Sequence, residues 1–156
     1  MKGSFFMVLT QKESSMIKDM KDQEKLCVEK YTKHSSCAKD PQLKNLFTYI
    51  AGVEQKHYDS LTQLEGGTVP AQGTGENSSF SFSANYANSA SPDKANDSFL
   101  CMDLLSGEKH VSHLYDTSIF EFKDSGARSF LNHIQKEEQE HGKLIYDYMS
   151  VNGMYS

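Results

Sequence analysis

The stretch IAGVEQKHYDSL, residues 50–61, has a near copy in IQKEEQEHGKLI, residues 134–145. Both contain the pattern Glu-x-x-His, which falls at Glu54 and His57 and again at Glu138 and His141. Residues three apart on an α-helix lie on one face, so each pair can present a carboxylate and an imidazole to the same ion. The duplication indicates that the two copies serve one site.

Both patterns lie on apolar stripes of helical period. The stripes are Leu43, Phe47, Ile50, Glu54, His57, Leu61 and Leu64 in the first copy, and Phe130, Ile134, Glu138, His141, Ile145 and Tyr148 in the second. The ionisable side chains therefore occupy positions that should face the core. Because a buried carboxylate without a positive partner is strongly unfavourable, the pattern favours a metal cation among these side chains.

The two copies belong to a longer repeat without gaps, in which residues 16–64 align with residues 100–148. Identical pairs are Asp19/Asp103, Glu24/Glu108, Lys25/Lys109, Tyr31/Tyr115, Lys39/Lys123, Asp40/Asp124, Ile50/Ile134, Glu54/Glu138, Gln55/Gln139 and His57/His141. Glu24 and Glu108 each precede the glutamate of the following Glu-x-x-His by the same distance (54 − 24 = 138 − 108 = 30). The predicted ligands are Glu24, Glu54, His57, Glu108, Glu138 and His141. Such a set, with one Glu from each of two helices and Glu-x-x-His from the other two, is typical of a dimetal-carboxylate four-helix bundle.

Local capping signals predict the helix boundaries. The capping box Thr10-x-x-Glu13 begins a helix that runs to about Ala38, and Asp40-Pro41 begins the next, which ends at Gly66-Gly67. Asp97 is the predicted N-cap of a third helix reaching about Lys123, and Asp124 or Ser125 opens a fourth that runs to about Val151, with Gly153 behind it.

Between the hairpins, about 10–65 and 97–152, lies a segment at 66–96 that is rich in Gly, Ser, Asn and Ala. A long loop inside a compact domain needs a reason. If the second hairpin starts at the end of the bundle where the second helix began, the loop must span about 39 Å, the length of roughly 26 helical residues. The prediction is a single domain over 1–156, an all-α, ferritin-like four-helix bundle with one long crossover, to which Phe80, Phe82 and Tyr86 give packing groups.

Charge and composition exclude several classes of protein. The net charge of −5 argues against a nucleic-acid binder. The apolar run at 5–9 is too short for a signal peptide or a membrane span, so neither is expected. Cys27, Cys37 and Cys101 are odd in number and form no Cys-x-x-Cys, which favours a reduced, intracellular origin.

Two segments of the second half, DLLSGEKHVSHLY at 103–115 and FLNHIQKEEQEHGKLIYDYMSVNGMY at 130–155, resemble the Coat F domain of the spore coat protein F-like family. In the first half, KDQEKLCVEKY, DPQLKNLF and VEQKH resemble the amino-terminal part of the longer members. This family belongs to the ferritin-like superfamily. The resemblance implies synthesis in the mother-cell cytoplasm, location in the spore coat and other coat proteins as partners. It leaves the oligomeric state open, a homo-oligomer included.

The superfamily implies a metal role for the six predicted ligands and often places a Tyr seven residues after the first Glu, as Tyr31 and Tyr115 do. It also often places an acidic residue before the Glu of Glu-x-x-His, to orient a His. Here that position is Glu137 in one copy and Val53 in the other, so support of this kind is expected on one side only. Carboxylates with two histidines suit two divalent ions, Fe or Mn, better than Zn.

Three functions remain open at this point. The chain is a spore coat protein with a dimetal centre, a ferritin-like dimetal oxidase or peroxide-scavenging enzyme, or a purely structural coat component. In the structural case the cluster is a relic metal site, retained as a buried hydrogen-bond network with raised carboxylate pKa values. The histidines off the ligand stripes, His34, His110, His113 and His133, are expected to have no metal role.

Overall fold

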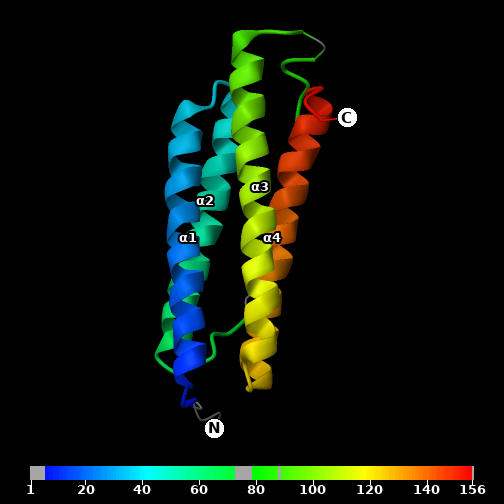
Figure 1. The fold of residues 1–156 in the computed structure, drawn as a ribbon. Helices are drawn as coiled ribbons and strands as arrows, with labels where there is room; N and C mark the ends of the chain where they lie inside the picture. The colour runs from blue at the N-terminus through cyan, green and yellow to red at the C-terminus, as the bar shows by residue number, and fades with distance from the viewer. Residues whose placement is uncertain (1–5, 73–78, 88, 156) are drawn as a thin grey trace.

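The structure is a computed structural model, and it describes residues 6–72, 79–87 and 89–155. Its helices are α1 (Gln11–Cys37), α2 (Pro41–Glu65), α3 (Pro92–Glu121) and α4 (Ser125–Val151). Figure 1 shows two antiparallel hairpins, α1 with α2 and α3 with α4, packed side by side into a bundle. The predicted all-α four-helix bundle with one long crossover is confirmed.

Three of the predicted N-caps are confirmed. Thr10 and Glu13 form a reciprocal capping box, in which the Glu13 amide donates to Thr10 Oγ1 and the Thr10 amide donates to Glu13 Oε1. Asp40 accepts from the Gln42 amide at the start of α2, and Asp124 accepts from the Ala127 amide at the start of α4. These side chains satisfy amides that the first helical turn leaves without partners.

The start of α3 differs from the prediction. Asp97 is not the N-cap, because Ser91, six residues earlier (97 − 91 = 6), caps the helix and Pro92 occupies its first turn. The Asp97 carboxylate instead accepts hydrogen bonds from the backbone amides of Lys39 and Asp40, at 2.8 and 2.9 Å, in the turn of the other hairpin. Its capping-type side chain serves a tertiary contact. The helix also ends at Glu121 rather than near Lys123.

The repeat gives this contact a counterpart. Glu13 occupies in the first half the place that Asp97 occupies in the second, and its Oε2 accepts from the amide of Lys123 at 3.2 Å. In each hairpin, one buried carboxylate from the first helix thus accepts hydrogen bonds from backbone amides in the turn of the other hairpin. The two contacts tie the hairpins together at opposite ends of the bundle.

The crossover, residues 66–91, returns the chain to the end of the bundle where α2 began (Figure 1). It leaves α2 through Gly67, whose φ of +91° is open to glycine and whose missing side chain lets the Met7 carbonyl approach. At the other end Phe80 packs on Tyr49 of α2, and Phe82 packs on Tyr148 of α4. Residues 73–78 and 88 of the predicted crossover lie outside the described residues.

The bundle places α1 beside α2 and α3, and α4 beside α3 and α2. A buried apolar core runs between the helices, with Tyr31, Phe47, Tyr115 and Tyr148 among its largest side chains. Glutamates and histidines lie within this core, and each of the four helices contributes at least one of them. None of the described helices is long and apolar enough to span a lipid bilayer.

Candidate metal centre

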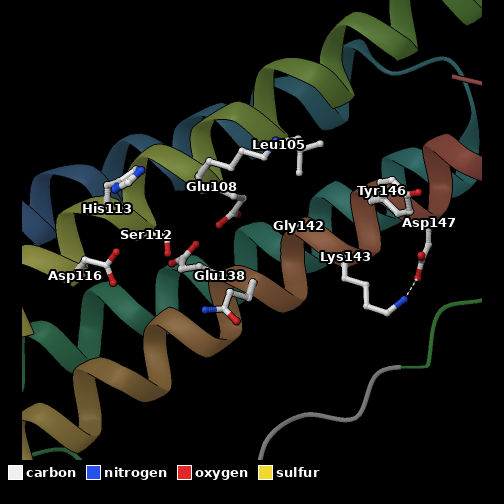
Figure 2. Close-up of a pocket in the computed structure, with 12 residues that line it drawn as sticks. Leu105, Glu108, Ser112, His113, Asp116, Glu138, Gly142, Lys143, Tyr146 and Asp147 are labelled. Atoms are coloured by element: carbon white, nitrogen blue, oxygen red, sulfur yellow. Dashed lines mark hydrogen bonds and ion pairs between the residues drawn. The ribbon is translucent and has the colours of Figure 1, made fainter. Parts of the chain in front are cut away.

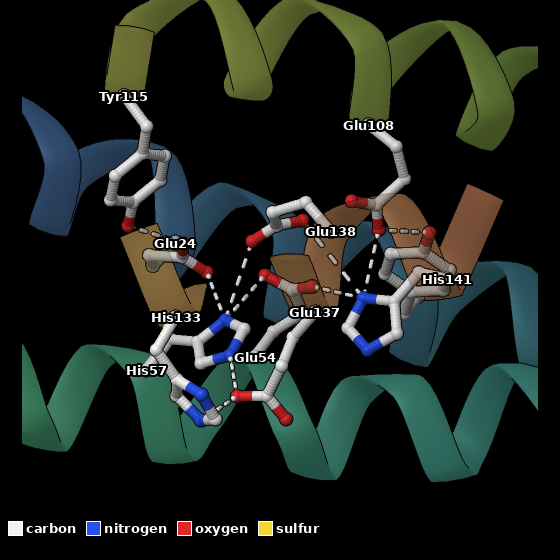
Figure 3. Close-up of polar contacts among 10 residues, drawn as sticks. Glu24, Glu54, His57, Glu108, Tyr115, His133, Glu137, Glu138 and His141 are labelled. Atoms are coloured by element: carbon white, nitrogen blue, oxygen red, sulfur yellow. Dashed lines mark hydrogen bonds and ion pairs between the residues drawn. The ribbon is translucent and has the colours of Figure 1, made fainter. Parts of the chain in front are cut away.

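The six predicted ligands lie together in the interior of the bundle (Figure 3). Glu24 comes from α1, Glu54 and His57 from α2, Glu108 from α3, and Glu138 and His141 from α4. None is more than 4% exposed. The apolar stripes bring them inward, because each stands where the stripe of its helix faces the core. An outward orientation of Glu24 and Glu108 would have removed the case for ion binding, and it is not observed.

One group of ligand atoms surrounds Nδ1 of His57. This nitrogen lies 3.6 Å from Oε2 of Glu24, 3.7 Å from Oε2 of Glu54 and 3.3 Å from Oε1 of Glu138. The four side chains offer ligand atoms that all lie within 4.8 Å of one another. An ion among them would have one nitrogen and three carboxylate neighbours.

The second group repeats this arrangement around Nδ1 of His141. Here the nitrogen lies 2.9 Å from Oε1 of Glu54, 3.3 Å from Oε1 of Glu108 and 3.9 Å from Oε2 of Glu138. The two imidazole rings stack with their centroids 6.2 Å apart. Glu54 and Glu138 belong to both groups and offer a different oxygen to each, which is the arrangement of two bridging carboxylates between neighbouring ions.

The cluster is incomplete as a network of hydrogen bonds. Among the described residues, its buried atoms without a hydrogen-bond partner are Glu24 Oε2, Glu54 Oε1 and Oε2, Glu108 Oε2, Glu138 Oε1 and Oε2, His57 Nδ1 and His141 Nδ1. Buried polar atoms in folded proteins nearly always have partners, and leaving one without a partner costs about 1–3 kcal/mol. Eight such atoms converge in one place, several of them at ion-pair distance from one another, and together they form a donor set that fits cations. Carboxylate oxygens and imidazole nitrogens are donors suited to Fe or Mn.

Two tyrosines hold the outer glutamates from the opposite half of the repeat. The Tyr31 hydroxyl donates to Glu108 Oε1 and the Tyr115 hydroxyl donates to Glu24 Oε1, each at 2.6 Å. Short hydrogen bonds of this kind to a carboxylate are charge-assisted and strong. On Glu24 the hydrogen bond leaves Oε2 to face His57, whereas on Glu108 the oxygen that accepts from Tyr31 is also the one that lies 3.3 Å from Nδ1 of His141.

Glu137 contacts only one of the two candidate ligand histidines, His57. Its Oε1 lies 3.1 Å from Nε2 of His57, on the far side of the ring from the carboxylate cluster, and also 3.1 Å from Nε2 of His133. A carboxylate in this position fixes the imidazole tautomer so that Nδ1 is left as the donor to an ion. The corresponding residue of the first copy is Val53, which has no polar side chain to offer His141.

The pKa values of the glutamates in the cluster shift in different directions. Burial and the charges of Glu24 and Glu108 raise the pKa of Glu54 well above its ordinary value, and burial with the charge of Glu108 does the same for Glu138. Burial alone would raise the pKa of Glu24, but the neighbouring Glu54 carboxyl and the charge of His57 lower it to about 2. In the protein without ions, these directions favour protons on the two shared carboxyls.

The histidines gain protons in the same environment. Burial would lower the pKa of His57, but the charge of Glu24 and the contact with Glu137 raise it well above its ordinary value. Burial acts in the same way on His141, and Glu108 raises its pKa. Without ions, the charges of the cluster are balanced by protons on the shared carboxyls and the imidazoles. Two divalent cations would supply the same positive charge while releasing those protons.

The sequence pattern missed two features of the site. It assigned no role to His133, which contacts Glu137 from one helical turn earlier, although the spacing of four residues could have indicated this pair. It also could not show that each tyrosine binds the glutamate of the opposite half. The structure brings all six predicted ligands together, whereas their metal binding remains a prediction.

These features define a class of protein, a four-helix bundle with a buried cluster of glutamates and histidines that could hold a metal ion. Within it, residues 96–156 match the Coat F domain. The resemblance seen in the second half is thereby confirmed, and it points to a protein associated with the spore coat. The matched segment includes Glu108, Glu138 and His141 but none of the predicted ligands of the first half. No curated protein and no solved structure matches the chain.

Proposed function

We propose that this chain is a spore coat component that binds two divalent cations, Fe or Mn, between its four helices. The observation that carries the proposal is the convergence of eight buried polar atoms without hydrogen-bond partners on two adjacent positions. The Coat F match supports the location in the coat, and the ferritin-like arrangement of helices supports the dimetal chemistry. Other coat proteins are its proposed partners.

The proposed ligands divide into terminal and bridging groups. Glu24 and His57 would hold one ion, Glu108 and His141 the other, and the shared Glu54 and Glu138 would bridge the pair. When bound, such a pair supplies redox chemistry toward dioxygen or peroxide, so oxidation of Fe²⁺ or disposal of peroxide is the activity that we attach to the site.

The remaining residues of the site prepare it for that chemistry. Tyr31 and Tyr115 fix the terminal glutamates, and Glu137 fixes the ring of His57. The surrounding core is apolar, so it excludes bulk water and strengthens electrostatic attraction between the ligands and a cation.

Metal analysis tests the proposal directly. Protein purified after growth in iron- and manganese-replete medium is expected to contain about two ions per chain, and Glu54→Gln is expected to lose both, because Glu54 belongs to both ligand groups. Peroxide consumption is then compared between the loaded wild type and the variant. Metal-free protein from replete medium would instead support the purely structural coat component, in which protons balance the cluster. Two ions without peroxide or Fe²⁺ turnover would support a coat protein with a structural dimetal site.

A further inference from the structure

A pocket of about 670 Å³ opens between α3 and α4, and the carboxylates of Glu108 and Glu138 lie at its inner end (Figure 2). Its lining also includes Leu105, Gly142 and Tyr146. A water molecule occupies about 30 Å³ of the liquid, and small-molecule sites in proteins measure about 300–1,000 Å³. The pocket is therefore far larger than dioxygen or peroxide requires and has the size of a site for an organic molecule.

The repeat provides an equivalent place in the first half with which this opening can be compared. A second pocket, of about 250 Å³, is lined by Lys25, Val28, Glu29, Gln55 and Tyr58. Each of these five has its repeat counterpart in the lining of the larger pocket, namely Lys109, Ser112, His113, Gln139 and Gly142. The smaller pocket includes no residue of the carboxylate cluster. The two pockets are thus equivalent places in the two halves, and only one of them reaches the site.

The difference lies mainly in one pair of residues, Tyr58 and Gly142. In the first half the side chain of Tyr58 lines the smaller pocket, and the Lys21 ammonium lies 5.0 Å from the centroid of its ring. In the second half Gly142 has no side chain, and Leu105 stands in the position of Lys21. The absence of a side chain at residue 142 leaves the groove between α3 and α4 open down to Glu108 and Glu138.

The chemistry of the lining selects the ligand. Leu105, Gly142 and the ring of Tyr146 contribute apolar surface, the lining also carries charges of both signs from Lys109, Lys143, Asp116 and Asp147, and the buried Glu108 Oε2 and both oxygens of Glu138 have no hydrogen-bond partner. The carboxylates at the inner end disfavour an anion there, and the apolar surface disfavours a small hydrated cation. A molecule that fits both parts has a flat apolar body and one hydroxyl group directed inward.

We propose that the groove between α3 and α4 binds an uncharged aromatic alcohol of about the size of phenol, with its ring between Leu105 and Tyr146 and its hydroxyl toward Glu108 and Glu138. In the protein without ions that hydroxyl donates to a carboxylate. In the loaded protein, Glu108, Glu138 and His141 would hold the ion nearest to that hydroxyl. This inference deepens the proposed function, on which the chemistry at the inner end of the pocket rests.

The test transfers the closing residue from one half to the other. A Cβ added at Gly142 would meet Leu105 Cδ1 at 3.6 Å, an ordinary contact, so the helix accepts a side chain there. Gly142→Tyr gives the second half the residue that Tyr58 provides in the first and is expected to fill the groove, and Gly142→Ala is the matched control that adds one methyl group. Phenol binding to the full chain, with and without Mn²⁺, is measured by ligand-detected nuclear magnetic resonance titration.

Wild type and Gly142→Ala are expected to bind phenol with similar affinity, and Gly142→Tyr to bind it at least about tenfold more weakly while keeping its helical content. Tyr58→Gly opens the equivalent groove and is expected to add a second phenol site, which provides a test independent of the folding of Gly142→Tyr. Equal binding by wild type and Gly142→Tyr, or no binding by wild type, overturns the inference. Phenol binding that depends on residue 142 in a chain that binds no Mn²⁺ would leave the pocket standing and refute the metal site.

Discussion

Cations bound at the cluster should stabilise the fold, and Glu54→Gln should abolish most of that stabilisation. Ions that bind only the folded chain stabilise it by about 2.7 kcal/mol per site at a free concentration of 100 times Kd. Two sites give about 5.4 kcal/mol. For a chain of 156 residues, 1 kcal/mol shifts Tm by about 2–4 °C. Saturating Mn²⁺ is therefore expected to raise the Tm of chelator-treated wild type by about 11–22 °C, as followed by far-ultraviolet circular dichroism.

Two variants divide that shift according to the geometry. Glu54 offers an oxygen to both ligand groups, so Glu54→Gln should reduce the shift to a few degrees, about the effect of non-specific ion binding. Glu24 belongs to one group only, so Glu24→Gln should retain about half of the wild-type shift. The comparison uses Gln because it preserves the shape of the side chain and removes its charge.

Glu13→Gln is the matched control. Glu13 is also a buried glutamate of α1, but it caps its own helix and contacts the Lys123 amide, away from the cluster. Its replacement should lower the Tm of the metal-free chain and leave the Mn²⁺-dependent shift unchanged. A full shift in Glu54→Gln, or a shift lost in Glu13→Gln, would show that ions stabilise the chain from elsewhere. No shift in wild type would refute metal binding by the cluster.

Three further substitutions probe the surroundings of the site. Glu137→Gln should lower the affinity for one of the two ions by about 10-fold or more, because it removes the carboxylate that orients His57. Isothermal titration calorimetry with Mn²⁺ should then show one site of lowered affinity and one of unchanged affinity. Tyr115→Phe should lower the free energy of unfolding of the metal-free chain by about 1.5–3 kcal/mol in urea titrations, since a buried charged acceptor loses its donor. Asp97→Asn should lower the free energy of unfolding by about 1–3 kcal/mol in the same titrations. The reason is that an amide group replaces one of the two carboxylate oxygens that accept from the turn of the first hairpin. An unchanged free energy of unfolding would show that the two hairpins are held together without this contact.

The helix boundaries that local chemistry determines were predictable from the sequence. Thr10, Asp40 and Asp124 cap the helices that follow them, because each satisfies amides of its own first turn. Asp97 is the same kind of residue, and its prediction as a cap was wrong because its carboxylate is used by the turn of the other hairpin, which lies far away in the sequence. A capping signal in one residue cannot show whether a distant amide competes for it.

The candidate ligands were predictable for a different reason. Helical period determines which face of a helix is buried, and a repeat without gaps places equivalent residues at equivalent heights in the bundle. Neither property indicates which half supplies the partner of a given side chain. The hydrogen bonds of Tyr31 and Tyr115 to the glutamates of the opposite half therefore appear only when the hairpins are packed together.

The two halves contribute the same candidate ligands but differ in what surrounds them, so the two proposed ion positions are chemically unequal. On the His57 side, Glu137 fixes the imidazole and Tyr58 lines the smaller pocket outside the cluster. On the His141 side, Val53 stands where a supporting carboxylate would be, and Gly142 leaves the groove open. An orienting carboxylate strengthens an ion site, while an opening lets an exogenous molecule compete for the coordination positions of the ion. The position beside His57 is therefore the one expected to retain its ion. The position beside His141 is the one at which an incoming molecule would bind.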